Sequence, residues 1–186
     1  MTFRALRLVA VATALLLVTP LVTRAAEKKK YSEPPKMQID QNKQYKAIID
    51  TSEGKIVCDL FPKEAPETVN SFVFLSKEKF YDGLTFHRVE DWVIQGGDPE
   101  GDGSGGPGYT VKNEAKNNTH KHKAGTLAMA RTADPDSAGS QFYITKETAS
   151  HLDGKYTIFG EVTEGMDVVN KIKKGDEIKS IRIEEK

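Results

Sequence analysis

Between residues 45 and 183 the chain is a series of short runs in which apolar and polar residues alternate, separated by turn-forming residues. Alternation with a period of two is typical of β-strands that bury one face. The clearest runs are 45–50, 55–61, 125–130, 139–144, 156–162 and 178–183. Only 66–79 and 166–172 show the spacing of amphipathic helices. Many short strands with two helices favour an antiparallel barrel or sandwich.

The length and the charge balance restrict what kind of protein this is. A chain of 186 residues can build one domain with a substantial core, but hardly two. The first 25 residues hold three of the 27 basic residues and no acidic one, which leaves 24 basic against 27 acidic residues in the remainder. A slightly acidic domain has no basic field to attract nucleic acid or anionic lipid. We therefore expect no nucleic-acid partner.

The amino terminus has the pattern of a targeting segment. Two early arginines precede an apolar run from Leu8 to Val22, and small residues follow at Thr23 and Ala25. This order predicts a signal peptide over residues 1–25, cleaved after Ala25, so that the processed protein has no stable membrane insertion. The alternative is a permanent membrane anchor, because the run is close to the minimum length of a span. In either case the sequence predicts export.

The segment 26–44 is charged, contains Pro34 and Pro35 and lacks sustained periodicity, so it is predicted to be a flexible linker to a domain at 45–186. Cys58 is the only cysteine, which excludes an internal disulfide. Its position in an alternating run favours a small buried hydrophobe over a reactive thiol.

The stretch 85–99, TFHRVEDWVIQGGDP, contains the residue that most needs an explanation. Alternation predicts that Phe86 and Arg88 share one face of a strand. A cation on the same surface as aromatic and apolar side chains is costly without a function. The structural alternative is a salt bridge from Arg88 to Glu90 or Asp91.

The glycine-rich segment 96–108 allows three interpretations. A phosphate-binding loop would continue with a lysine that the sequence lacks, and a calcium loop starting at Asp98 would need a glutamate where Tyr109 stands. A structural loop needs only the glycines. His120 and His122 have no third ligand near them in the sequence. We expect neither a metal nor another cofactor.

Five segments, in this order along the chain, resemble the cyclophilin family of peptidyl-prolyl cis–trans isomerases. They are Phe86-His87-Arg88, Val93-Ile94-Gln95-Gly96-Gly97-Asp98, Leu127-Ala128-Met129-Ala130, Gly139-Ser140-Gln141-Phe142, and Leu152-Asp153-Gly154-Lys155 with Phe159-Gly160. The resemblance spans roughly residues 45–183. It implies a mainly β fold, an eight-stranded antiparallel β-barrel capped by two α-helices, with a surface groove for proline-containing peptides.

The resemblance also assigns roles to individual residues. Arg88 matches the catalytic arginine of the family, and Gln95 and Gln141 match the polar groove residues that act with it. The remaining positions are expected to contact substrate, and they are Phe86, Trp92, Val93, Ala130, Arg131, Tyr143, His151, Leu152 and Tyr156.

Several positions depart from the common pattern of the family. Arg131 replaces an asparagine, Tyr156 replaces a histidine, and the turn between Arg88 and Gln95 is one residue shorter. His151 stands where cyclosporin-sensitive members carry tryptophan, so cyclosporin binding is expected to be weak. These substitutions resemble those of bacterial members and, with the leader, they imply a periplasmic enzyme, expected to be a monomer.

The implied activity is acceleration of rotation about X–Pro bonds in peptides and in folding exported proteins. Amide resonance opposes this rotation with a barrier of about 18–20 kcal/mol, and a guanidinium near the pyramidal nitrogen favours the twisted state without a covalent intermediate. The alternative, motivated by the altered rim, is a proline-peptide binding module or chaperone with weak or no catalysis.

Overall fold

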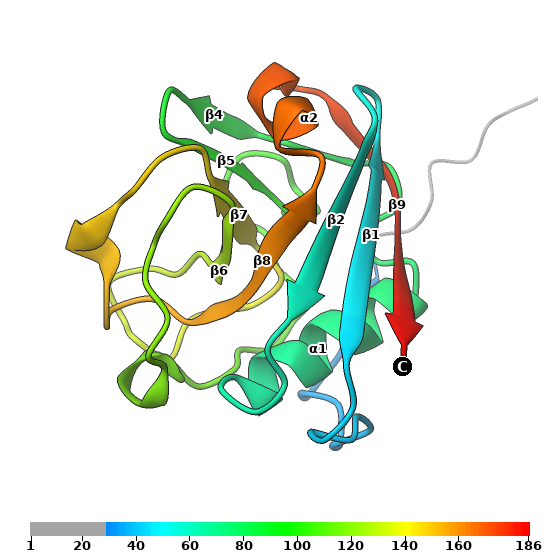
Figure 1. Cartoon of the computed structure of the whole chain (residues 1–186). Helices are drawn as coiled ribbons and strands as arrows, with labels where there is room; N and C mark the ends of the chain where they lie inside the picture. The colour runs from blue at the N-terminus through cyan, green and yellow to red at the C-terminus, as the bar shows by residue number, and fades with distance from the viewer. Residues whose placement is uncertain (1–28) are drawn as a thin grey trace, which may run out of the picture.

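The computed structural model describes residues 29–186, so the predicted signal peptide lies outside the described residues. Figure 1 shows one sheet curled between two helices. The elements are β1 (Tyr45–Thr51), β2 (Lys55–Leu60), α1 (Pro66–Lys77), β3 (Leu84–Thr85), β4 (Arg88–Glu90), β5 (Val93–Gly96), η1 (Ala115–Asn117), β6 (Thr126–Met129), β7 (Phe142–Thr145), η2 (Ser150–Leu152), β8 (Ile158–Glu164), α2 (Met166–Lys171) and β9 (Glu177–Glu185). Among residues 29–186, no helix is long and apolar enough to cross a membrane.

All strands belong to one antiparallel sheet with the order β3-β9-β1-β2-β8-β6-β7-β5-β4. Its two edge strands, β3 and β4, are consecutive in the chain and are separated only by residues 86 and 87. Residues 84–90 therefore act as a single strand whose first part pairs with β9 and whose second part pairs with β5. Counted in this way the sheet has eight strands and closes on itself, so the predicted eight-stranded barrel with two helices is confirmed.

The ends of the barrel segment are also joined to each other. β1 pairs with β9 from Tyr45–Glu185 onward, and the backbones of Gln44 and Lys186 exchange hydrogen bonds of 3.1 and 2.9 Å. On its other side β1 forms a hairpin with β2: the two strands pair antiparallel, and the N–H of Thr51 donates to the carbonyl of Gly54 at 2.8 Å.

Helix α1 covers one end of the barrel and supplies an aromatic side chain to its interior. Pro66 starts the helix, where its missing N–H costs nothing. The Glu114 carboxylate accepts from the N–H groups of Glu67 and Thr68, at 3.0 Å each, and so satisfies the free donors at the helix start. Phe72 packs inside the barrel against Tyr81, Phe142 and Phe159, with ring centroids 5.1–5.7 Å apart.

Cys58 of β2 is fully buried and belongs to the main hydrophobic core of the barrel. Removal of the thiol from water raises its pKa to about 12, so the thiolate is not available at neutral pH. The prediction of a small buried hydrophobe is confirmed.

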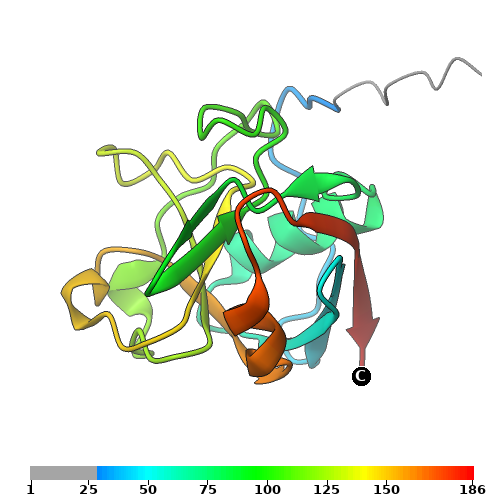
Figure 2. The ribbon, with the colours of Figure 1, turned by 90° about the horizontal axis from the view of Figure 1, so that it is seen from above.

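Residues 29–44 are folded onto the domain. The N–H of Tyr31 donates to the carbonyl of Pro107 at 2.8 Å, and the Tyr31 ring packs edge-on against Phe74, with centroids 5.0 Å apart. Figure 2 shows this segment, in blue, beside the green loop that contains Pro107. Ile39 is buried in the core cluster, and the N–H of Gln38 donates to the Asn70 side chain at 2.8 Å. The flexible linker predicted for 26–44 is therefore wrong for residues 29–44, because Tyr31 packs on Phe74 of α1 and Ile39 is buried in the core cluster.

Replacement of Ile39 by alanine tests this attachment. The Ile39 side chain is 7% exposed, and its truncation is expected to lower the free energy of unfolding by about 2–4 kcal/mol. Met37→Ala is the matched control, since Met37 is 49% exposed and its truncation is expected to change the free energy by less than about 0.5 kcal/mol. Urea denaturation followed by circular dichroism measures both, and equal small effects would show that the segment does not stabilise the domain.

Candidate active site

A pocket of about 260 Å³ lies where β4, β5, β7 and the loop around η2 meet. Strand alternation explains its position: Phe142 and Ile144 of β7 point into the main core, whereas Tyr143 between them belongs to a separate apolar cluster on the other face. The pocket is lined by Arg88, Trp92, Gln95, Ala130, Arg131, Tyr143, His151, Leu152 and Tyr156. These are nine of the twelve site residues that the sequence predicts, and the fold brings them together.

The other three predicted residues lie elsewhere. Val93 is fully buried beneath the pocket, packed in the cluster that contains Tyr143, and Gln141 lines an adjoining hollow of about 650 Å³. Phe86 is fully buried in the main core and lines neither pocket. The prediction that Phe86 shares a face with Arg88 is wrong. The chain changes pairing partner between Thr85 and Arg88, so the alternation is interrupted there.

Arg88 is held by a chain of polar side chains along the groove. Its Nη1 donates to Oε1 of Gln95 at 3.0 Å, Nε2 of Gln95 donates to Oε1 of Gln141 at 2.9 Å, and Nε2 of Gln141 donates to the carbonyls of Gly103 and Gly105, both at 2.9 Å. In this arrangement each amide oxygen accepts and each amide nitrogen donates. A continuous chain of hydrogen bonds thus links the Arg88 guanidinium to the glycine-rich loop and helps to orient it.

Glu90 binds Arg88 from the other side. Its Oε1 accepts from Nε of Arg88 at 2.7 Å and its Oε2 accepts from Nε1 of Trp92 at 2.8 Å. These hydrogen bonds lower the pKa of Glu90, and the one from Arg88 has the larger effect. The Arg88 guanidinium also lies 5.5 Å from the centre of the Trp92 ring. The salt bridge that the sequence analysis offered as an alternative is present, together with the groove contacts.

The glycine-rich loop is organised from within by Asp98, whose side chain is buried. Its Oδ1 accepts from the N–H of Glu100 at 2.9 Å and its Oδ2 from the N–H of Gly103 at 2.5 Å. Gly97 has a φ of 83°, and a Cβ there would lie 2.4 Å from the carbonyl oxygen of Ser140. The loop therefore needs glycine for close backbone approach, and these contacts support the structural interpretation of the segment.

Aromatic rings and one cation form the far wall of the pocket. The guanidinium of Arg131 stacks 4.5 Å from the centre of Tyr156 and donates to the carbonyl of Lys155 at 3.0 and 3.1 Å. Tyr156 in turn meets Tyr143 edge-on at 6.1 Å. Burial raises the pKa of the Tyr143 hydroxyl, which therefore stays protonated. The two substitutions at the rim, at positions 131 and 156, stabilise each other.

Sequence reasoning considered His122 only as a metal ligand and missed its contacts beneath the pocket. Its Nε2 lies 2.8 Å from the Tyr143 hydroxyl and its Nδ1 lies 3.0 Å from Oδ1 of Asp153. His120 instead stacks on Phe61, with ring centres 3.9 Å apart. One sequence signal could have indicated the contact: a tyrosine at a pocket position needs a buried partner for its hydroxyl.

Comparison with known proteins decides which family this is. Residues 46–186 match the family described as "Cyclophilin type peptidyl-prolyl cis-trans isomerase/CLD".

The chain belongs to the cyclophilin family.

Bacterial cyclophilins are among its relatives. It is 50% identical over 132 residues to peptidyl-prolyl cis-trans isomerase B of Bacillus subtilis, which covers 70% of this chain and 92% of that protein. It is 49% identical over 138 residues to the peptidyl-prolyl cis-trans isomerase of Helicobacter pylori, covering 73% and 84%. The crystal structure of a Cryptosporidium parvum cyclophilin superposes with a TM-score of 0.69 at 30% identity, covering 76% of this chain and 98% of that one. The protein is thus a peptidyl-prolyl cis–trans isomerase with the cyclophilin fold.

Gln95→Leu tests the importance of the polar chain in this cyclophilin. Gln95 accepts from the charged Arg88 and donates to Gln141, so its loss should lower kcat/KM by about tenfold, the usual cost of one charge-assisted hydrogen bond. Gln44→Leu, the same change at an exposed position, should leave kcat/KM unchanged. A protease-free assay of an Ala-Pro peptide measures both, and unchanged kcat/KM in Gln95→Leu would mean that Arg88 does not depend on this contact.

Proposed function

We propose that Arg88 catalyses the isomerisation by stabilising the twisted X–Pro amide, and that the substrates are proline-containing segments of proteins folding after export. In the ground state, amide resonance makes the nitrogen planar and leaves it without a free lone pair. Rotation makes the nitrogen pyramidal and exposes its lone pair. A donor aimed at that nitrogen interacts with the twisted amide and not with either planar isomer, so it lowers the barrier in both directions.

Only some of the hydrogen-bond donors of Arg88 are used within the protein, and this supports the proposal. Nε is used by Glu90 and one Nη1 hydrogen by Gln95, while Nη2 has no hydrogen-bond acceptor among residues 29–186. The side chain is 42% exposed and faces the pocket. Two fixed contacts orient the guanidinium, and the remaining donors are available to a bound peptide.

The pocket suits a proline ring. Tyr143 is almost fully buried at its base, and Trp92, Leu152 and Tyr156 are partly buried members of the same apolar cluster. A bound ring that fills this space would exclude water from the region of Arg88, which strengthens the interaction of the guanidinium with the amide nitrogen. A related Cryptosporidium parvum structure, with a TM-score of 0.69 and 31% identity, was solved in the presence of the dipeptide Ala-Pro.

The required energy is modest. A thousandfold acceleration corresponds to about 4 kcal/mol of preferential stabilisation of the transition state. Removal of one preorganised donor from an active site commonly costs about a hundredfold to a thousandfold in rate. One oriented guanidinium in a partly dry pocket is therefore sufficient, and no nucleophile is needed.

Arg88→Ala is the direct test of the mechanism. We expect kcat for cis-to-trans isomerisation of an Ala-Pro peptide to fall about a hundredfold or more, with a much smaller change in peptide affinity, because the apolar pocket remains. Arg88→Lys should recover little of the loss, since an ammonium cannot reproduce the rigid fork that binds Glu90 and Gln95 together.

Arg182→Ala is the matched control, because Arg182 lies on β9 and pairs only weakly with Asp50, at 4.0 Å. It should keep full activity. Turnover that survives in Arg88→Ala would leave the isomerase activity in place and overturn the arginine mechanism. Peptide binding without turnover in the unaltered protein would instead identify a binding module.

Export is proposed from the leader pattern of residues 1–25. Mass spectrometry of the protein isolated from its native host should find a mature chain that begins at Ala26, in the fraction outside the cytoplasmic membrane. Ala25→Lys should block processing and retain the leader, because signal peptidases require a small residue there. A full-length mass for the unaltered protein would show that the leader is kept.

A further inference from the structure

His122 lies beneath the pocket, and both of its ring nitrogens have hydrogen-bond partners although the residue does not line the pocket. It is fully buried, and four hydrogen bonds involve its backbone and ring. The backbone N–H and ring Nδ1 contact Oδ1 of Asp153 at 2.9 and 3.0 Å, Nε2 contacts the Tyr143 hydroxyl at 2.8 Å, and its carbonyl accepts from the N–H of Ala149 at 2.9 Å. The residue thus connects strand β7 to both ends of the η2 loop.

The arrangement assigns a tautomer to the neutral imidazole. The Asp153 carboxylate can only accept, so Nδ1 carries the hydrogen and Nε2 has the lone pair. The Tyr143 hydroxyl then donates to Nε2. A buried tyrosine hydroxyl without a partner would be costly, and this bond fixes the position of the ring edge.

We propose that His122 is a positioning residue for the isomerase: it holds the Tyr143 ring and the loop 149–153 as one unit and so sets the shape of the pocket that receives the proline ring. Tyr143 forms the base of the pocket, and His151 and Leu152 of the loop form its rim. The inference rests on the proposed function, in that proline must bind in this pocket.

A change at His122 should affect substrate binding more than turnover, because His122 does not contact the polar groove residues. Within residues 29–186 it has no hydrogen bond to Arg88, Gln95 or Gln141. A substitution of His122 should therefore leave the Arg88 guanidinium in place for the rotation step. A looser pocket weakens the binding of the ground state and of the transition state alike. We therefore expect KM to rise while kcat stays nearly constant.

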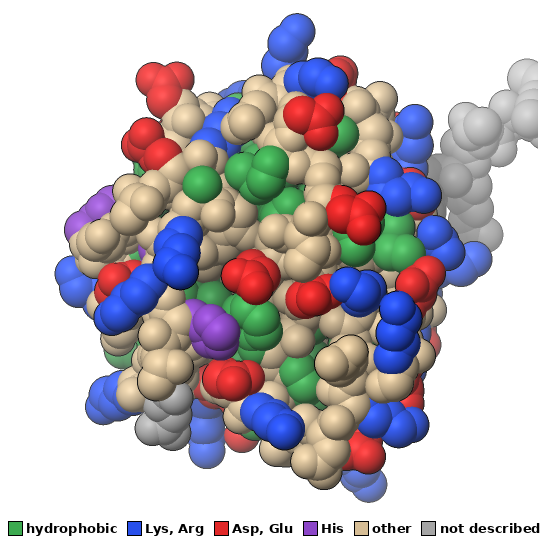
Figure 3. Space-filling view, viewed as in Figure 1, with side chains coloured by type: hydrophobic (Ala, Val, Ile, Leu, Met, Phe, Trp, Pro, Cys, Tyr) green, Lys and Arg blue, Asp and Glu red, His purple; other side chains and the backbone are tan. Residues whose placement is uncertain are grey.

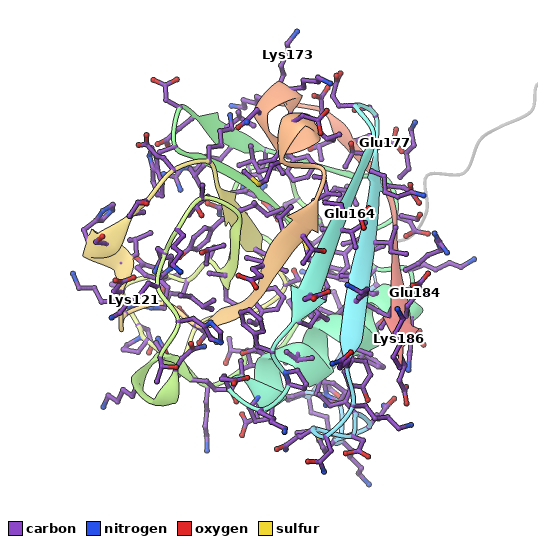
Figure 4. All side chains as sticks on the ribbon, viewed as in Figure 1. Lys121, Glu164, Lys173, Glu177, Glu184 and Lys186 are labelled. Carbon is purple, nitrogen blue, oxygen red and sulfur yellow. The ribbon has the colours of Figure 1, made fainter. Side chains whose placement is uncertain are left out.

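A pH dependence is expected from the same contacts. Burial lowers the pKa of His122 from its usual 6.5, the hydrogen bond to Asp153 opposes this, and the nearby charges of His151 and Lys121 lower it further. Figure 4 shows Lys121 beside the η2 loop, where its Nζ lies 3.7 Å from Oδ2 of Asp153. Once His122 is protonated, both ring nitrogens donate, and the Tyr143 hydroxyl can no longer donate to Nε2. Because the pKa of His122 is lowered, this protonation occurs in more acidic solution than for an ordinary histidine, and KM should rise only there.

His122→Asn and Tyr143→Phe test the proposal. An asparagine amide can replace Nδ1 as donor to Asp153 but does not reach the Tyr143 hydroxyl, and phenylalanine removes that hydroxyl while the ring remains. Each variant should raise KM for an Ala-Pro peptide by about three- to tenfold, as expected for one lost buried hydrogen bond, with kcat within about twofold. The double variant should match the single ones, because both delete the same bond.

His120→Asn is the control, since His120 lies two residues away and stacks on Phe61. It should keep the KM and the pH profile of the unaltered protein, whereas His122→Asn should lose the rise of KM at acid pH. An unchanged KM in Tyr143→Phe, which retains the packing of the ring, would overturn the proposal, as would an acid rise that persists in His122→Asn.

The parallel measurement on Arg88→Ala separates the two hypotheses. A collapse of kcat in Arg88→Ala with an unchanged KM in His122→Asn would refute only the role of His122. Full turnover in Arg88→Ala together with the expected rise of KM in His122→Asn would refute only the arginine mechanism.

Discussion

The site depends on the way the barrel closes. Residues 84–90 pair with β9 in their first part and with β5 in their second part, and within residues 29–186 no other segment joins the two ends of the sheet. At the change of partner the Phe86 backbone bonds to Asp176 and Gly175, at 2.9 and 3.0 Å, while its ring enters the core. Two residues later Arg88 emerges on the opposite side. The fully buried ring thus fixes the position of the Arg88 guanidinium.

Electrostatics in the groove are local. Acidic and basic side chains are interspersed over the face of the molecule seen in Figure 3. Within the groove, the Glu90 carboxylate pairs with Arg88 and neutralises much of its charge. Gln95 and Gln141 link the guanidinium by hydrogen bonds to the carbonyl of Gly103 in the glycine-rich loop. In the proposed mechanism a guanidinium balanced in this way acts only over hydrogen-bond distance, which suits a reaction that separates no full charges.

How much could be predicted from the sequence differs between parts of the molecule. Alternation located most strands, and the motifs located nine pocket residues, because both signals are local. The attachment of residues 29–44 was missed since Tyr31 and Ile39 are isolated apolar residues in a charged, proline-containing segment, and their partners, such as Phe74, lie far along the chain. The same limit applies to His122 and Asp153, which are separated by 31 residues. Contacts between distant polar residues leave no periodic trace.

The pairing of β1 with β9 has a consequence for the order of folding. The first strand of the barrel lies between its neighbour in sequence, β2, and the last strand of the chain, and Gln44 and Lys186 are bonded to each other. A chain synthesised from its amino terminus cannot complete this sheet before β9, at Glu177–Glu185, is available, and such long-range pairing is slow to form. Until then β1 keeps one unpaired edge, which is the kind of surface that other chains, or a chaperone, can bind.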